Sequence, residues 1–91
     1  RAVLEAMSSG CCVVVSDISD FHRFIEHGKN GFLFPAGDIG TLRNILQSIL
    51  NNPAVIQEIS LEASKTMKQR FTDKHETLAL LELYQQDAMM A

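Results

Sequence analysis

The sequence predicts an α/β fold built on a parallel sheet. Residues 11–15, Cys-Cys-Val-Val-Val, form a nearly continuous apolar run, which is typical of a strand covered on both faces. A second short strand is expected at residues 32–34, after a segment with helical spacing. Three helices are expected to close the chain. The length of 91 residues suffices for one small domain.

The first half of the chain supplies a helix, two strands and the turns between them. Residues 1–8 have the spacing of a helix end, and Gly10 is the residue type that ends helices in a left-handed conformation. After the first strand, one apolar stripe predicts a short helix, formed by Phe21, Phe24 and Ile25. Residues 28–31, Gly-Lys-Asn-Gly, predict a turn before the second strand.

The second half is predicted to be helical. Asp38 is the expected N-cap of a helix, whose apolar face comprises Leu42, Ile45, Leu46, Ile49 and Leu50. Asn51-Asn52-Pro53 breaks this helix, and Pro53 occupies the tolerated first position of the next one. The apolar side of that helix comprises Ile56, Ile59, Ala63 and Met67. Thr72 is expected to cap a last helix, with one face formed by Leu80, Leu81, Tyr84 and Ala88.

Two strands do not make a stable open sheet by themselves. A strand covered on both faces needs parallel neighbours, and we expect these to precede Arg1. The sequence therefore predicts that residues 1–91 are the C-terminal portion of an α/β domain whose upstream strands are missing.

Composition excludes several classes of function. Apolar residues make up 46% of the chain and charged residues 21%, which is ordinary for a globular domain. The net charge of −3 gives no reason to expect a nucleic-acid partner. The longest apolar run, residues 11–15, is far too short for a transmembrane segment, and no signal peptide is visible.

The cysteines and histidines do not predict a metal site. Cys11 and Cys12 are adjacent, and we interpret them as small core residues of a reduced, cytoplasmic protein. The three histidines, His22, His27 and His75, do not form a ligand spacing with them. No metal and no cofactor are therefore expected.

Two motifs at a matching separation resemble one known family. The string LEAMSSGC at residues 4–11, followed by VVVSD, resembles the donor-binding segment of the retaining "group 1" glycosyltransferases. IEHGKNGFLFPAGD, at residues 25–38, matches the next segment of that family. The closing helices, with Arg-Phe-Thr at residues 70–72 and Leu83-Tyr84, match its C-terminal tail. The resemblance thus covers the whole chain.

The resemblance implies a GT-B fold, in which two Rossmann-like domains enclose the active site. Glu5 matches the second glutamate of the family's conserved pair, which accepts hydrogen bonds from the ribose hydroxyls of a nucleotide-sugar donor. Without the resemblance, Glu5 would be interpreted as a solvated helix residue. The first glutamate of the pair would fall before Arg1. Arg1 itself could contact a donor phosphate, and a solvated arginine is the equal alternative.

Two positions depart from the family pattern. Cys12 replaces a customary proline, and Ser19-Asp20 replaces a stretch that is Gly-Gly or contains proline in many members. We therefore interpret Asp17 and Asp20 as helix caps. His22 and Arg23 are interpreted as surface residues.

The leading hypothesis is that the chain is the donor-side part of a glycosyltransferase. It would transfer a sugar from a nucleotide diphosphate to an acceptor hydroxyl, in polysaccharide or glycolipid synthesis. The fragment supplies no catalytic residue and is expected to be inactive alone, because the acceptor domain is missing. The expected location is cytoplasmic, with contact to the inner membrane face through that domain left open. The alternatives are a non-catalytic interaction module and a GT-B relative such as a sugar-nucleotide epimerase or a phosphorylase.

Overall fold

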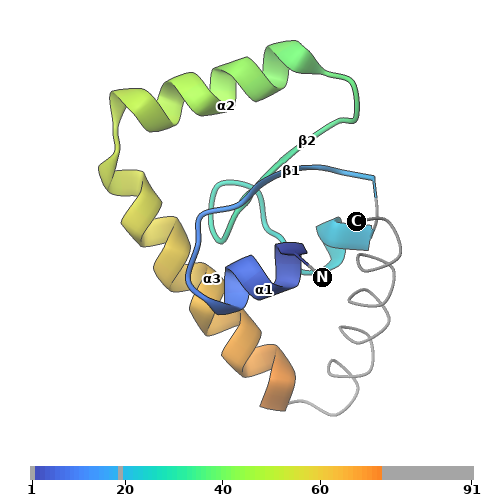
Figure 1. Ribbon diagram of the computed structural model, residues 1–91, viewed down its shortest axis with the longest axis vertical. Helices are drawn as coiled ribbons and strands as arrows, with labels where there is room; N and C mark the ends of the chain where they lie inside the picture. Colours follow the sequence, from blue (N-terminus) through green and yellow to red (C-terminus); the bar gives the residue numbers. More distant parts are fainter. Residues whose placement is uncertain (1, 19, 73–91) are drawn as a thin grey trace.

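The computed structural model describes residues 2–18 and 20–72 of the chain (Figure 1). The two strands lie between helix α2 and helix α1, and helix α3 runs along one side of both (Figure 1). This arrangement confirms the predicted α/β class. The elements, in chain order, are α1 (Ala2–Ser8), β1 (Val14–Ser16), the 3₁₀ helix η1 (Asp20–Arg23), β2 (Phe32–Phe34), α2 (Ile39–Asn51) and α3 (Ala54–Thr72).

Strands β1 and β2 form a parallel pair, in which Val14 lies opposite Phe32 and Ser16 lies opposite Phe34. A backbone bond from Asp17 N to the Phe34 carbonyl, at 2.9 Å, extends the ladder beyond the end of β1. Because the strands are parallel, their carboxyl ends lie at the same edge of the sheet. We refer to this edge, with the segments that follow each strand, as the carboxyl edge.

The first strand begins later than the sequence predicted. Helix α1 ends in a Schellman motif, with Gly10 at a φ of 79°. Gly10 N donates to the Met7 carbonyl and Cys11 N donates to the Ala6 carbonyl, at 3.0 and 2.9 Å. The Cys11 amide is thus used by the helix cap, and pairing with β2 starts only at the Val13 carbonyl. The expectation that residues 11–15 form the strand was therefore wrong at both ends.

The larger part of the core joins α1, η1 and α3. The predicted stripe of Phe21, Phe24 and Ile25 is buried, although its helix is a 3₁₀ turn of four residues rather than an α-helix. The rings of Phe21 and Phe24 meet edge to face, with centroids 6.1 Å apart. This cluster comprises Leu4, Met7, Val13, Phe21, Phe24, Ile25, Ala63 and Met67.

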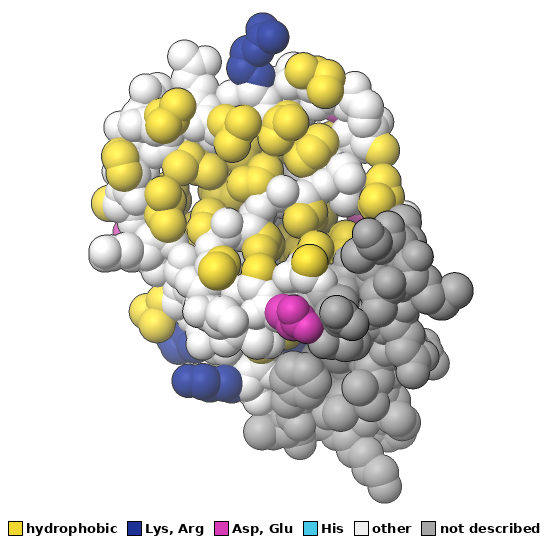
Figure 2. All heavy atoms as spheres, viewed as in Figure 1, with side chains coloured by type: hydrophobic (Ala, Val, Ile, Leu, Met, Phe, Trp, Pro, Cys, Tyr) yellow, Lys and Arg dark blue, Asp and Glu magenta, His cyan; other side chains and the backbone are white. Residues whose placement is uncertain are grey.

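Helix α2 makes a weaker contribution to the core. Ile45 is buried against Phe32 and Ile59, which together form a second cluster. Leu46 and Leu50, predicted on the same face, are 46% and 77% exposed. The predicted helix is confirmed, but its apolar stripe is wider than the surface that the described residues cover. Figure 2 shows a broad region of apolar side chains on the side of the molecule that carries the strands.

The boundary between α2 and α3 follows the prediction closely. Helix α2 ends at Asn51, and α3 begins at Ala54, directly after Pro53. Along α3 the predicted residues Ile59, Ala63 and Met67 are buried, whereas Ile56 is 40% exposed.

The end of α3 differs from the prediction. Thr72, expected to cap a last helix, is the final residue of α3. The expected helix with Leu80, Leu81, Tyr84 and Ala88 lies outside the described residues. Within residues 2–18 and 20–72, no helix combines the length and hydropathy needed to cross a membrane.

Candidate functional site

Open α/β sheets bind ligands outside the carboxyl ends of their strands, so a ligand is expected at the carboxyl edge. Helix α1 and strand β1 run in opposite directions, so the beginning of α1 lies on the same side as the end of β1 (Figure 1). Leu4 of α1 and Phe21 of η1 belong to the same buried cluster, so the two helices share one core. Helix α1, the connection from β1 through η1, and the segment after β2 thus surround this edge.

Glu5 lies on α1, on the face opposite the buried residues. Leu4 and Met7 point into the core with exposures of 2% and 0%, whereas Glu5 is exposed. Its backbone carbonyl accepts a bond from Ser9 N at 3.0 Å, which belongs to the helix end. Arg1, the second predicted donor contact, lies outside the described residues.

Asp17 and His22 form a side-chain pair just beyond β1. The distance from His22 Nδ1 to Asp17 Oδ1 is 3.3 Å, and both side chains remain accessible to solvent. The sequence predicts a capping role for Asp17, whereas its carboxylate contacts the imidazole in the structure. Asp20 lies in the first turn of η1.

Asp38, beyond the end of β2, caps helix α2 as predicted. Its carboxylate accepts bonds from the backbone N of Thr41 at 3.0 Å and from Thr41 Oγ1 at 2.7 Å. These bonds favour the ionised form, so the pKa of Asp38 lies below its ordinary value of 3.8. The carboxylate is therefore occupied by the cap.

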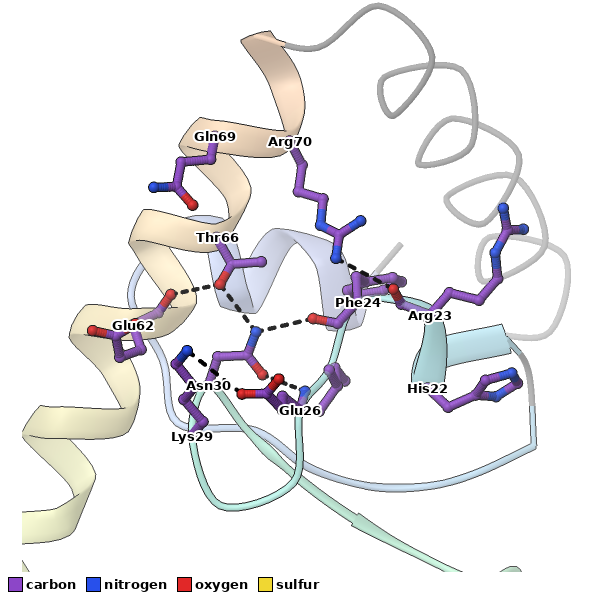
Figure 3. A pocket seen from close by; sticks show the side chains of 11 residues that line it. His22, Arg23, Phe24, Glu26, Lys29, Asn30, Glu62, Thr66, Gln69 and Arg70 are labelled. Atoms are coloured by element: carbon purple, nitrogen blue, oxygen red, sulfur yellow. Dashed lines mark hydrogen bonds and ion pairs between the residues drawn. The ribbon is translucent and has the colours of Figure 1, made fainter.

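A pocket of about 300 Å³ lies between α3 and the segment that precedes β2 (Figure 3). Asn30, only 5% exposed, is the buried polar residue of this region. Its Oδ1 accepts from Glu26 N at 2.7 Å, and its Nδ2 donates to the Phe24 carbonyl at 2.9 Å and to Thr66 Oγ1 at 3.0 Å. Thr66 in turn donates to the Glu62 carbonyl at 2.8 Å.

These bonds give the amide of Asn30 a structural function. Each hydrogen bond made by its side chain ends on a group of the protein, so this buried amide offers a ligand little unmet hydrogen-bonding capacity. The sequence predicts only a turn position for Asn30. Its partner Thr66 lies 36 residues further along the chain, and no local pattern signals that contact.

The charged residues around this pocket are largely compensated. Lys29 Nζ lies 3.5 Å from Glu26 Oε2, and Arg70 donates to the Arg23 carbonyl at 3.4 Å (Figure 3). Glu62 adds a further carboxylate to the lining. The pocket therefore shows no concentration of one sign of charge.

Neither cysteine is paired, and their surroundings differ. Cys11 is exposed and Cys12 is half-buried, and burial raises the pKa of the Cys12 thiol. Among the described residues, no group of three or more His, Cys, Asp or Glu side chains is placed to hold a metal ion.

Comparison with known proteins identifies the family of the chain. The sequence profile of the glycosyl transferases group 1 matches residues 1–77, which is most of the chain. The chain belongs to the group 1 glycosyl transferases. The resemblance inferred from the two motifs is thereby confirmed.

Two curated glycosyltransferases also match most of this chain. The chain is 36% identical over 69 residues to a phosphatidyl-myo-inositol mannosyltransferase of Mycobacterium leprae (strain TN), covering 76% of this chain and 18% of the relative. It is 34% identical over 70 residues to the amylovoran biosynthesis glycosyltransferase AmsK of Erwinia amylovora, covering 77% and 17%. The chain therefore spans less than a fifth of the length of the curated relatives it matches.

Proposed function

We propose that residues 1–91 form the C-terminal, donor-side part of a GT-B glycosyltransferase that uses a nucleotide-sugar donor. The complete protein transfers the sugar to an acceptor hydroxyl in polysaccharide or glycolipid synthesis. Membership of the group 1 family supports the reaction class. The names of the two relatives, one a mannosyltransferase acting on phosphatidyl-myo-inositol and one assigned to amylovoran synthesis, support the acceptor classes.

The observation that carries the proposal is the position of Glu5. It is exposed on a helix that starts at the carboxyl edge and shares a buried cluster with η1 through Leu4. An ionised carboxylate accepts hydrogen bonds through two oxygens, which suits the adjacent hydroxyls of a ribose ring. In this role Glu5 holds the donor without taking part in bond making or breaking.

The leaving diphosphate needs positive charge around it. Negative charge grows on the diphosphate as the bond to the sugar breaks, so preorganised donors and cations there lower the barrier. We assign that function to groups elsewhere in the complete protein, with Arg1 as the one proposed phosphate contact in this chain. Correct placement of the donor and the acceptor lowers the activation barrier further.

The proposal also assigns partners and a location. The acceptor glycan or glycolipid is held by the other domain of the complete protein. The reaction takes place in the cytoplasm, and a lipid-linked acceptor is met at the inner face of the membrane.

The test is donor binding by the complete protein that contains this chain. We expect Glu5→Ala to weaken binding of a nucleoside diphosphate at least tenfold, as measured by calorimetry, because a single hydrogen bond to a charged group contributes about 1.5–3 kcal/mol. Glu58→Ala serves as the matched control, because Glu58 is also an exposed helix carboxylate, on α3. An unchanged affinity in Glu5→Ala would remove the assignment of Glu5.

Product analysis distinguishes the reaction classes. Transfer predicts a glycosylated acceptor and a free nucleoside diphosphate. An epimerised sugar, or a sugar phosphate formed from inorganic phosphate, would contradict the proposed reaction. A complete protein that binds no nucleotide would contradict the proposal as a whole.

A further inference from the structure

The Asp17–His22 pair is held in place from both sides. Asp17 is fixed to the sheet, because its backbone N donates to the Phe34 carbonyl at 2.9 Å. His22 lies between Phe21 and Phe24, which are each 4% exposed and anchor η1 in the core. The backbone at each end of the pair is thus anchored, by the sheet at Asp17 and by the core beside His22, although the side chains of the pair are 39% and 57% exposed. This arrangement preorganises the imidazole at the carboxyl edge.

The contact with Asp17 decides which nitrogen of His22 is available. An ionised carboxylate only accepts hydrogen bonds, so Nδ1 carries the proton that faces Asp17 Oδ1 at 3.3 Å. In the neutral ring, Nε2 is then a hydrogen-bond acceptor. Figure 3 shows the ring of His22 directed away from Asn30 and from the side chains of α3, so it lies apart from their hydrogen-bond network.

Charged groups of both signs lie beside His22. Asp17 pairs with the ring, and Asp20 lies in the first turn of the same 3₁₀ helix. Carboxylates repel a phosphate but accept hydrogen bonds from hydroxyls. Arg23 ends the same 3₁₀ helix, and Arg70 donates to its backbone carbonyl at 3.4 Å, so two guanidinium groups balance these carboxylates and an uncharged, hydroxyl-rich ligand fits the site.

We propose that His22 accepts a hydrogen bond from a hydroxyl of the transferred sugar through Nε2, and that Asp17 is the positioning residue that orients its ring. The inference rests on the proposed function, because it assigns a substrate contact within the same donor site. In this proposal two elements of the chain bind different parts of the donor. Glu5 on α1 holds the ribose, and the Asp17–His22 pair holds the sugar.

The test compares two ligands in the complete protein. The first is the nucleotide sugar that the wild type binds most tightly among GDP-mannose, UDP-glucose and UDP-galactose. The second is the corresponding nucleoside diphosphate, which lacks the sugar. We expect His22→Leu to weaken binding of the nucleotide sugar about tenfold, and to change binding of the nucleoside diphosphate less than twofold.

Further variants separate a ligand contact from a structural effect. His22→Gln places an acceptor oxygen near the position of Nε2 and is expected to recover most of the lost affinity. Asp17→Ala is expected to weaken nucleotide-sugar binding severalfold, whereas Asp17→Asn retains an acceptor for Nδ1–H and is expected to stay closer to the wild type. Gln57→Leu, at an exposed position of α3, is the matched control for a polar residue replaced by leucine.

The outcomes distinguish this inference from the proposed function. If His22→Leu leaves nucleotide-sugar affinity unchanged, or weakens both ligands equally, the sugar contact is wrong while nucleotide binding stands. If the wild type binds neither ligand, both the inference and the proposed function fail. Recovery by His22→Gln, together with an unchanged melting temperature for His22→Leu, supports the inference.

Discussion

The side-chain amide of Asn30 donates to Thr66 Oγ1 at 3.0 Å, joining residues that lie 36 positions apart in the sequence. Two more bonds, to Glu26 N and to the Phe24 carbonyl, fix the segment before β2. Asn30 thus links the segment before β2 to helix α3.

We expect Asn30→Ala to destabilise the fold by about 3 kcal/mol, because three groups in buried or part-buried hydrogen bonds lose their partner at once. Thermal or urea unfolding followed by circular dichroism measures this change. Asn44→Ala, at an exposed position of α2, is the control and should change the free energy of unfolding by less than about 0.5 kcal/mol. Equal effects at both positions would show that the Asn30 bonds contribute little to stability.

Gly31 occupies a position where a larger residue does not fit. A Cβ added there would lie 3.0 Å from Val13 Cγ2 and 3.1 Å from Ile25 Cγ2. We expect Gly31→Ala to cost about 1–3 kcal/mol of unfolding free energy, because the added methyl group overpacks the contact with Val13 and Ile25.

Gly40 is the matched comparison for this substitution. It lies in the first turn of α2, and an added Cβ would meet only Asp38 Oδ1, at an ordinary 3.6 Å. Gly40→Ala is therefore expected to be neutral or to stabilise the protein by up to about 1 kcal/mol, since alanine favours helix. Denaturant unfolding of the two variants side by side checks both signs, and destabilisation by both would refute the steric argument.

The cap of α2 gives the stability a dependence on pH. The bonds from Thr41 lower the pKa of Asp38 in the folded protein, so the unfolded chain binds more protons as the pH falls. The contribution of Asp38 is complete above its ordinary pKa of 3.8 and is lost as the pH drops through the lower folded value.

We therefore expect Asp38→Ala to lower the melting temperature at neutral pH, with a difference from the wild type that shrinks in acid. Asp38→Asn keeps a capping oxygen but removes the titration, so it should lose less stability at neutral pH. A difference between wild type and Asp38→Ala that stays constant down to pH values well below 3.8 would contradict the cap as the source.

Burial along α3 predicts unequal costs for two apolar truncations. Met67 is 1% exposed within the cluster that joins α1 and α3, whereas Leu61 is 62% exposed on the same helix. We expect Met67→Ala to destabilise the fold by about 2–5 kcal/mol, and Leu61→Ala by less than about 0.5 kcal/mol. Urea midpoints provide the comparison, and a Leu61→Ala effect as large as that of Met67→Ala would show that another surface covers Leu61.

Local chemistry accounts for the features that the sequence predicted correctly. Gly10 ends α1, and Asp38 starts α2, because each acts on backbone groups within a few residues. The apolar stripe of Phe21, Phe24 and Ile25 also became core. The extent of β1 was missed, because use of the Cys11 amide by the helix cap delays pairing with β2.

The candidate site was only partly visible in the sequence. Glu5 was identified through the family motif, and its exposed position on α1 is compatible with the proposed contact. The Asp17–His22 pair was not predicted, because a carboxylate five residues before a histidine has no meaning until η1 turns the two side chains together. The structural role of Asn30 was not predicted either, because its partner Thr66 lies 36 residues further along the chain.

By itself the sequence determined the order of the described elements, the caps at Gly10 and Asp38, and the family to which the chain belongs. These follow from periodicity, from local hydrogen bonding and from motifs that are contiguous along the chain. Only the tertiary structure decided that Asn30 meets Thr66, that Leu50 stays exposed while Ile45 is buried, and that Asp17 faces His22. Such contacts depend on how separate elements pack in space, and no pattern within a single element encodes that.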